Sequence, residues 1–306
     1  MSAGPLAASS RLLTFDVEEY FQIEAARDVV DVEQWDTRHS RIHRQVDWLL
    51  ATLADHDCRA TFFALGWLAR RHRPMIEAIA HAGHEVACHG FAHDRLHRLT
   101  EAQARLDIRT AKAILEDITG QPVIGYRAPT FSLDHRTAWA IDVLAEAGFT
   151  YDSSIQPIRR SAYGVPDAPR HPFRLIGPGG GELLEIPPLT WQIGKYRLPV
   201  AGGGYFRLFP LRCMLNGIAQ AHRAGQPAML YFHPWEFDPQ QPRMPLVGIK
   251  RFRTYVGLRR AGRRIESLMQ RGSGQAVRDW LGAQHPARWP EYRLTDLSAS
   301  SQRAAA

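Results

Sequence analysis

The 306-residue sequence has little cysteine and no long hydrophobic run. Its three cysteines, at positions 58, 88 and 213, include no pair at CxxC spacing. This argues against a disulfide framework and a cysteine-rich metal site, and free thiols suit a reducing compartment. No apolar run has the length of a transmembrane helix, and residues 1–10 lack the basic segment and apolar core of a secretory signal. We therefore expect a cytoplasmic protein.

Two frequent catalytic signatures are also missing. The sequence contains no Gly-x-Ser-x-Gly elbow, which would present a serine nucleophile. The glycine-rich turn at 202–204 lacks the GxxxxGK[ST] pattern of a phosphate-binding loop. The net charge of +7 indicates only a mild preference for anionic partners, because the arginines are scattered apart from a cluster at 259–264. Nucleic-acid binding has no other support.

What is present is an ordinary globular composition with alternating strand and helix patterns. Hydrophobic residues make up 45% and charged residues 23% of the chain. Short apolar runs predict strands at 11–16, 60–65, 85–88, 122–127, 149–152, 183–186 and 228–233. Amphipathic patterns predict helices between most of them, including one that begins with a capping box formed by Thr100 and Gln103. Such alternation is typical of a parallel α/β fold.

Two histidines follow the third predicted strand. His89 and His93 stand four residues apart around Gly90. Side chains at this spacing can face the same way on a helical turn and share one metal ion. The spacing alone is a weak signal, because the chain has 14 histidines. A catalytic metal site would need at least one further ligand.

Ionisable residues stand at the carboxyl ends of several predicted strands. In a parallel α/β barrel these ends open onto one rim, where active sites lie. A set of different ionisable types on one rim is hard to explain by packing alone, since buried charges are costly unless paired. The residues are Asp16, His89, Arg127, Asp152 and His233.

The ordered motifs resemble those of the polysaccharide deacetylases of the NodB-homology type, carbohydrate esterase family four. The resemblance runs from about residue 12 to residue 236, and its details are similar to the branch associated with exopolysaccharide and exosortase (PEP-CTERM) systems. It implies a distorted (β/α) barrel, a divalent metal, most often zinc, and removal of acetyl groups from N-acetylated sugars. The motifs are Thr14-Phe15-Asp16, His89-Gly90-x-x-His93, Arg127-Ala128-Pro129 and Tyr231-Phe232-His233.

The resemblance also implies a role for each rim residue. Asp16 would be the general base, held in its ionised form by Arg127. His89 and His93 would bind the metal, and His233 would be the general acid, oriented by Asp152. Amide hydrolysis independently needs these parts: an activated water, a polarised carbonyl and a proton for the leaving nitrogen.

The chain departs from the family pattern directly after Asp16. The family has a second aspartate there as a metal ligand, whereas this chain has Val17. Residues 16 and 18 share a face of a strand, so Glu18 is the best candidate for the third ligand, and Glu19 is a weaker one. If neither binds metal, the site is weak or metal-free, as in related cyclic-amide hydrolases. Thr130, where many relatives have an aromatic residue, leaves open how the acetyl oxygen is received.

Three functional hypotheses follow. The first is a metal-dependent N-deacetylase acting on an exopolysaccharide or its lipid-linked precursor, with peripheral association at the inner membrane face. The others are a metal-independent hydrolase of small cyclic amides or ureides, and a catalytically silent carbohydrate-binding scaffold. Trp191, Tyr205 and Trp235 are candidates for stacking on sugar rings, although ordinary packing explains each equally well.

We expect four segments along the chain. Residues 1–10 form a flexible tail, and residues 11–236 form the NodB-type domain. Residues 237–290 form a C-terminal extension that packs on the barrel, and residues 291–306 form a second tail.

Overall fold

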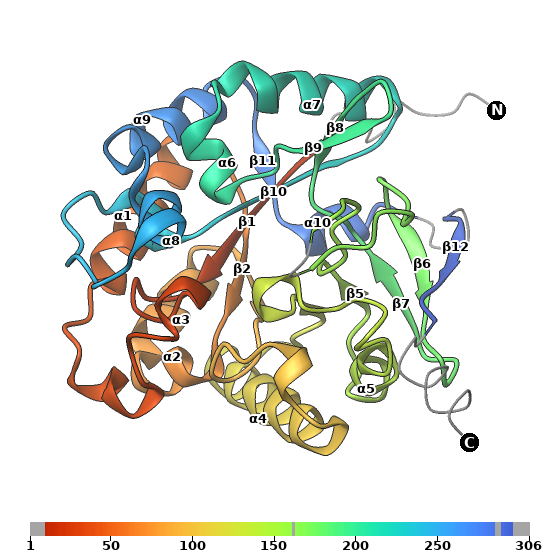
Figure 1. The fold of residues 1–306 in the computed structure, drawn as a ribbon, viewed down its shortest axis with the longest axis horizontal. Coiled ribbons are helices and arrows are strands. Elements are labelled where there is room, and N and C mark those ends of the chain that lie inside the picture. Colours follow the sequence, from red (N-terminus) through yellow and green to blue (C-terminus); the bar gives the residue numbers. More distant parts are fainter. Residues whose placement is uncertain (1–9, 161–162, 285–288, 296–306) are drawn as a thin grey trace.

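The centre of the molecule is a curved, mostly parallel sheet with helices on its outer side (Figure 1). The structure is a computed structural model and describes residues 10–160, 163–284 and 289–295. Most of the two predicted tails lies outside these residues. The strands are β1 (Arg11–Val17), β2 (Thr61–Ala64), β3 (Glu85–Cys88), β4 (Gly125–Tyr126), β5 (Tyr151–Asp152), β6 (Phe173–Ile176), β7 (Glu182–Glu185), β8 (Thr190–Ile193), β9 (Tyr196–Pro199), β10 (Ala228–Phe232), β11 (Gly274–Gln275) and β12 (Glu291–Arg293).

Helices connect and cover these strands. The α-helices are α1 (Ile42–Asp55), α2 (Gly66–Arg71), α3 (Arg73–His81), α4 (Glu101–Thr119), α5 (Ala140–Glu146), α6 (Gly203–Leu208), α7 (Leu211–Arg223), α8 (Gly248–Tyr255), α9 (Leu258–Met269) and α10 (Val277–Leu281). The short 3₁₀ helices are η1 (Glu24–Ala26), η2 (Val32–Thr37), η3 (Leu96–Arg98), η4 (Pro129–Phe131) and η5 (Pro234–Phe237). Among the described residues, no helix is both long and apolar enough to cross a bilayer.

The sheet order runs β10-β1-β2-β3-β4-β5-β7-β6-β12, with β11 added beside the start of β1. Among the described strands of this sheet, only β6 and β7 pair antiparallel. The chain after β7 continues to β10, where Leu189 N donates to Met229 O at 3.0 Å and Tyr231 N donates to Ala201 O at 3.2 Å. These bonds close the sheet into the distorted α/β barrel that the strand–helix alternation predicts.

The amino-terminal end of the barrel is filled by apolar side chains. Leu12, Phe63, Tyr151 and Met229 point inward from different strands and pack with Trp280 of α10. The outward-facing residues of the same strands pack under the helices in a second, larger core. Because side chains fill the amino-terminal half of the barrel, a cavity can form only toward the carboxyl ends of the strands.

Local signals in the sequence set several element ends. The Thr100 side chain accepts from Gln103 N, and the Gln103 side chain accepts from Thr100 N, which confirms the capping box at the start of α4. The same helix ends at Gly120, whose φ of 63° is left-handed and suits glycine.

The C-terminal segment differs in part from its prediction. Beyond residue 237, β11 extends the sheet beside β1, and α10 fills the barrel floor. The segment expected to be a tail contains β12, which pairs with β6. The hairpin β8–β9 was not predicted either. The domain boundaries themselves stay a prediction.

Candidate active site

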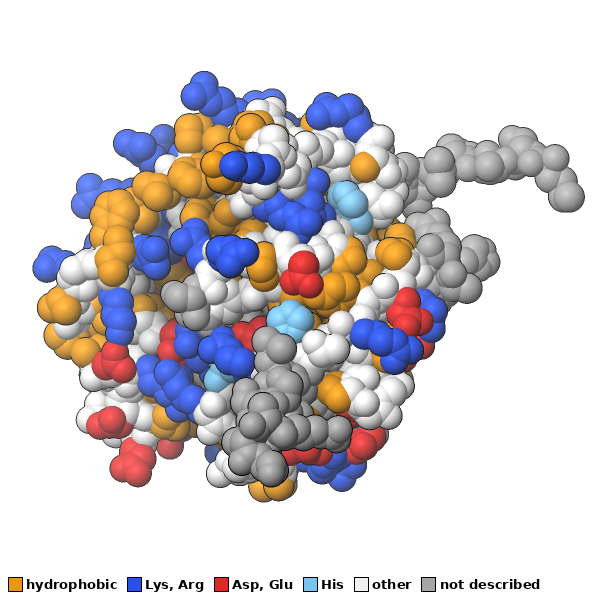
Figure 2. Space-filling model, turned by 45° about the vertical axis from the view of Figure 1, so that its right-hand side comes forward, with side chains coloured by type: hydrophobic (Ala, Val, Ile, Leu, Met, Phe, Trp, Pro, Cys, Tyr) orange, Lys and Arg blue, Asp and Glu red, His pale blue; other side chains and the backbone are white. Residues whose placement is uncertain are grey.

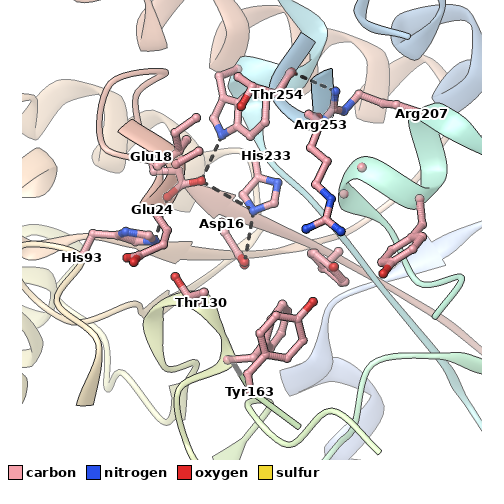
Figure 3. Close-up of a pocket in the computed structure, with 18 of the residues that line it drawn as sticks. Asp16, Glu18, Glu24, His93, Thr130, Tyr163, Arg207, His233, Arg253 and Thr254 are labelled. Carbon is pink, nitrogen blue, oxygen red and sulfur yellow. Dashed lines mark hydrogen bonds and ion pairs between the residues drawn. The ribbon is translucent and has the colours of Figure 1, made fainter. Parts of the chain in front are cut away.

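A cavity of about 480 Å³ opens at the carboxyl ends of the strands (Figure 3). Asp16 at the end of β1, His89 after β3 and His233 after β10 line it together with Glu18 and His93. Of the five residues expected on one rim, Asp16, His89 and His233 line this cavity, whereas Arg127 and Asp152 are not among its lining residues.

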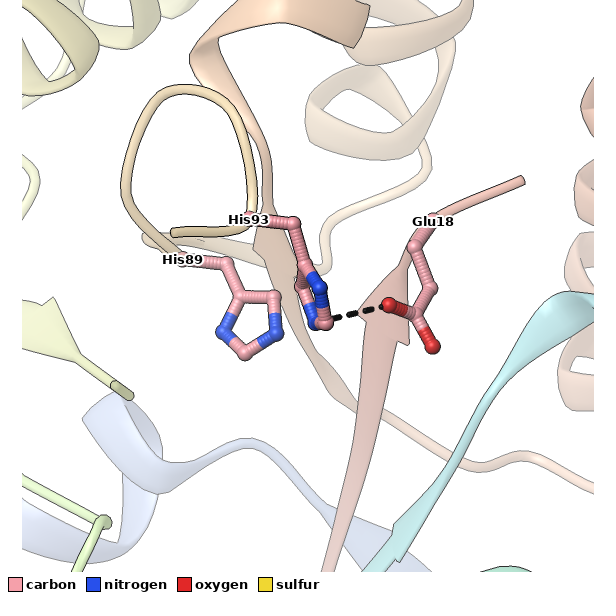
Figure 4. A group of neighbouring side chains, drawn as sticks. All are labelled: Glu18, His89 and His93. Carbon is pink, nitrogen blue, oxygen red and sulfur yellow. Dashed lines mark ion pairs between the residues drawn. The ribbon is translucent and has the colours of Figure 1, made fainter. Parts of the chain in front are cut away.

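Glu18, His89 and His93 form a buried cluster (Figure 4). One ligand atom from each lies within 4.8 Å of the others. His89 Nδ1 is 2.8 Å from the Arg127 carbonyl oxygen, so the other ring nitrogen is left for the cluster. A carboxylate with two imidazoles is a common zinc-binding set.

The Glu18 carboxylate is suited to bind a cation. Its Oε1 accepts a hydrogen bond from Trp235 Nε1 at 3.0 Å. Its Oε2 lies 2.9 Å from His93 Nε2, yet it is buried and has no partner in hydrogen-bonding geometry. Buried carboxylate oxygens are normally satisfied, so this atom suits a metal ion held with the two histidines.

Glu19 forms hydrogen bonds away from the cavity, and this distinguishes it from Glu18 as a candidate ligand. It points to the other side of the chain, where its Oε1 accepts bonds from Ser40 Oγ, Arg41 N and Ile42 N at 2.6, 2.8 and 3.1 Å. It therefore supports the start of α1. Strand alternation explains why Asp16 and Glu18 face the cavity together.

A tight turn presents the two histidines. Gly90 has a φ of 76°, and an added Cβ would lie 3.1 Å from Asp107 Oδ2. Asp107 of α4 accepts a hydrogen bond from Phe91 N at 2.9 Å. His93 itself has a φ of 55°. The left-handed backbone here is uncommon for non-glycine residues and brings His93 back over His89.

Arg127 lies inside the barrel and holds Asp16. Its NH1 donates to Asp16 Oδ1 at 2.5 Å and to Thr14 Oγ1 at 2.8 Å. Its Nε and NH2 donate to the carbonyl and hydroxyl oxygens of Ser153. The guanidinium is fully buried over the Phe63 ring. These bonds fix the Asp16 carboxylate with its second oxygen toward the cavity.

His233 lies between the acidic side chains of Asp16 and Glu18 in the cavity (Figure 3). Its Nε2 is 3.6 Å from Glu18 Oε1 and 3.8 Å from Asp16 Oδ2. Its Nδ1 is 3.0 Å from Glu236 Oε2, and Glu236 Oε1 in turn accepts from Arg207 Nε at 2.6 Å. The ring also stacks on Trp235.

Burial and neighbouring charges shift the pKa values of the ionisable groups in the cavity. Burial alone would lower the pKa of His233, but the bond to Glu236 and the negative charges around it raise this pKa to about 9. Burial would raise the pKa of Glu18, but the neighbouring histidines, His93 first, lower it to about 2. Burial lowers the pKa of His89 to about 4. A charged His233 can give a proton, and a neutral His89 can bind a metal.

The structure does not bring Asp152 to His233, and Glu236 occupies the expected position. Asp152 accepts from the Ser154 hydroxyl at 2.6 Å and the Ser154 amide at 3.0 Å. Burial raises the pKa of Asp152 and, together with the charge of Asp152, that of Glu185 beside it. The two carboxyls are buried beside one another, and neither is among the residues that line the cavity. Glu236 and Arg207 are the residues that the sequence reasoning missed.

Of the three aromatic candidates, two line the cavity. Tyr205 lies on its wall with Arg160 stacked over the ring. Trp235 is buried. Its indole nitrogen donates to Glu18 and its ring stacks on His233, so it positions these two residues. Trp191 lies in the β8–β9 hairpin against Gly217 of α7 and is not among the cavity-lining residues.

A strained turn forms another part of the wall. Thr130 and Phe131 both have left-handed φ angles, 57° and 54°. Thr130 is β-branched, so this conformation is a true outlier, and both residues line the cavity. Strain of this kind tends to collect at functional sites.

Two family models match the chain. Residues 35–151 match the polysaccharide deacetylase model, and residues 153–281 match a domain of unknown function, DUF3473. The first match contains the histidine pair and Arg127. The second contains His233, Glu236 and helices α6 to α9.

Curated relatives align over part of the chain. A peptidoglycan deacetylase-like protein, FGM2, from Gibberella zeae is 31% identical over 32% of this chain and 28% of its own. A peptidoglycan deacetylase from Helicobacter pylori is 29% identical over 35% of this chain and 36% of its own. The aligned part thus spans about a third of the length of these relatives.

Solved structures share the fold over nearly the whole chain. A putative polysaccharide deacetylase from Mycobacterium smegmatis aligns at a TM-score of 0.61 with 21% identity, covering 92% of this chain and 91% of that one. A probable polysaccharide deacetylase from Pseudomonas aeruginosa PAO1 and the Puue allantoinase both align at 0.56 with 18% identity. The former covers 90% of this chain and 91% of its own, and the latter 93% and 96%. These likenesses confirm the NodB-type barrel. The family-model match over residues 35–151 and the partial alignments with the curated relatives make this chain similar to polysaccharide deacetylases over part of its length.

Proposed function

We propose that the protein is a metal-dependent hydrolase that removes N-acetyl groups from an amino-sugar polysaccharide or its lipid-linked precursor. The observation that carries this proposal is the meeting of Glu18, His89 and His93 with Asp16 and His233 at the floor of one cavity. The homology to deacetylases of the family supports the class of reaction.

Glu18, His89 and His93 would hold the metal, and the proposed ion is zinc. When bound, a divalent ion of this kind supplies Lewis acidity toward a carbonyl and lowers the pKa of water. The buried Glu18 oxygen without a hydrogen-bond partner and the free ring nitrogen of His89 fit this group.

The two protons of the reaction are assigned to two side chains. Asp16, held by Arg127, accepts a proton from the water that attacks the acetyl carbon. His233, charged below its pKa of about 9, donates a proton to the amide nitrogen as the C–N bond breaks. Acetate and a free amine leave, and the proton on Asp16 returns to solvent or to His233.

Tyr205 is the proposed platform for a sugar ring, since it lies on the cavity wall and its ring offers an apolar face. We also propose a place in exopolysaccharide biosynthesis, with the protein at the inner face of the membrane.

Acetate release from a short N-acetylglucosamine oligomer tests the reaction. We expect Asp16→Asn and His233→Gln to lower kcat by about 10²–10⁴ in folded protein. Arg71→Met, which breaks an exposed pair with Asp36, is the matched control and should keep activity. A folded wild type that releases no acetate from any N-acetylated oligomer when supplied with zinc, but opens a cyclic ureide without metal, would replace this proposal by the metal-independent cyclic-amide hydrolase.

A further inference from the structure

The positive charge of the chain is concentrated in one segment. Residues 239–265 contain eight lysines or arginines and no aspartate or glutamate, whereas the whole chain has a net charge of only +7. The rest of the protein is therefore close to neutral. This segment includes α8 and most of α9.

The same segment exposes large apolar side chains. Val247, Ile249 and Phe252 are 77%, 61% and 50% exposed, and Leu208 at the end of α6 is 47% exposed. Ile249, Phe252 and Leu208 all line the mouth of the active-site cavity. Val247 directly precedes α8, which carries Ile249 and Phe252. We call Val247, Ile249, Phe252 and Leu208 the apolar rim.

Arginine bonds tie the three helices of this rim together. Arg207 of α6 donates to the carbonyl oxygens of Thr254 and Val256 at 2.9 and 2.7 Å. Arg264 of α9 donates to the carbonyl oxygens of Phe206 and Phe209 at 2.6 and 3.0 Å. These bonds hold α6, α8 and α9 together, so the apolar rim is exposed to solvent without any rearrangement of the helices.

Most cations around the apolar rim are not neutralised. Lys250 pairs with Asp28. Within the described part of the chain, six guanidinium groups of α8 and α9 form no ion pair. Arg264 donates to backbone carbonyl oxygens, and the other five are exposed: Arg251, Arg253, Arg259, Arg260 and Arg263. Figure 2 shows hydrophobic side chains bordered by lysine and arginine at the upper left, the side on which Figure 1 draws α6, α8 and α9.

We propose that the apolar rim and these five arginines are a docking surface for an anionic lipid bilayer. Exposed aliphatic and aromatic residues next to unpaired cations are the features of an interfacial helix, which buries its apolar side chains among acyl chains and its cations among headgroups. A hydrophilic anionic polymer would use the cations but would gain nothing from Val247 or Ile249. The two features together favour the bilayer.

Docking in this way sets the cavity mouth against the headgroups. Arg253 reaches from α8 into the cavity near His233 (Figure 3). Its guanidinium is placed to bind the phosphate of a lipid-linked amino sugar while the sugar reaches Asp16 and His233. This consequence rests on the proposed function, whereas docking itself does not.

Vesicle co-sedimentation of the full chain tests the proposal. We expect binding to vesicles containing phosphatidylglycerol to be at least about tenfold tighter than to phosphatidylcholine alone, and to weaken with salt. Ile249→Asp/Phe252→Asp should weaken binding by about tenfold or more, because it removes the inserted groups. Leu106→Asp, which changes an even more exposed leucine on α4, is the matched control and should bind like the wild type.

Three results would overturn docking: no binding of the wild type, equal binding by Ile249→Asp/Phe252→Asp, or equally tight binding to a soluble anionic polymer that the double substitution leaves unchanged. The vesicles contain no sugar, so these results do not depend on deacetylation. Conversely, absence of acetate release in a protein that binds vesicles would count against the proposed function alone.

Discussion

His233 and Glu236 form the contact that sets the protonation of the cavity, with Nδ1 and Oε2 3.0 Å apart. Glu236 is buried, and burial alone would raise its pKa, but Arg207 and His233 lower it. The carboxylate therefore stays charged and holds the imidazole in its positive form. Since the pKa of His233 is raised, this contact stabilises the fold below about pH 6.5, and the stabilisation is lost as pH rises through about 9.

Removing the charge of Glu236 should move the titration of His233. In Glu236→Gln we expect the pKa of His233 to fall from about 9 to about 7, because an adjacent carboxylate typically changes a pKa by about 1–3. NMR titration of metal-free protein measures it. Asp152→Asn is the control and should leave the pKa of His233 unchanged, because Asp152 bonds to Ser154. A lowered pKa of His233 in Asp152→Asn and an unchanged one in Glu236→Gln would instead identify Asp152 as the orienting group.

The buried ion pair between Arg127 and Asp16 should contribute to the stability of the fold. Arg127→Met leaves the Asp16 carboxylate buried without its cation, and we expect the free energy of unfolding in urea to fall by about 3–5 kcal/mol. The exposed pair of Arg71 and Asp36 gives the matched control, with a loss of at most about 1 kcal/mol in Arg71→Met.

A double substitution separates the charge from the packing of Arg127. Asp16→Asn/Arg127→Met removes both charges, so it should recover a large part of the loss seen in Arg127→Met. Equal stability of the single and double variants would show that packing over Phe63, and not the ion pair, carries the effect.

Asp107 should make stability depend on pH through the turn that carries the histidines. Burial raises the pKa of Asp107 to about 6, above an unfolded value of about 4. Ionisation of Asp107 therefore destabilises the folded state relative to the unfolded state. Through this group alone, the free energy of unfolding should fall by about 2 kcal/mol as pH rises from 4 to 6.

Asp107→Asn removes that titration and still offers an oxygen to Phe91 N. The difference in unfolding free energy between variant and wild type, measured in urea from pH 4 to 7, should grow in favour of the variant up to about pH 6 and then stay level. Other groups titrate equally in both proteins and cancel. A difference that is constant with pH would contradict the burial of a charge at this position.

Much of the fold could be predicted because local patterns determine it. The helix expected to begin at the capping box of Thr100 and Gln103 is α4, and the apolar run at 228–233 contains β10. The strand expected at 122–127 is paired only at Gly125–Tyr126, and the hairpin β8–β9 was missed. Residues in β8 and β9 are partly exposed, so they lack the continuous apolar run that marks a buried strand.

The site was predictable to the extent that strand ends determine it. Asp16, His89 and His233 follow buried apolar strands, and parallel strands bring such ends to one rim. The partner of His233 was not predictable in this way, because η5 folds Glu236 back onto it. The spacing His233-Pro234-x-Glu236, with proline at the first helical position, was the available signal. Arg207 approaches from α6 through tertiary packing alone.

The most direct test of the account is the metal content of purified wild type beside Glu18→Ala and His89→Ala. The account predicts about one divalent ion per folded wild-type chain, and loss of both the ion and acetate release in each variant. Glu19→Ala, which changes a carboxylate that supports α1, should keep the ion. A folded wild type that releases acetate without bound metal, or a Glu18→Ala protein that retains the ion, would contradict the proposed centre.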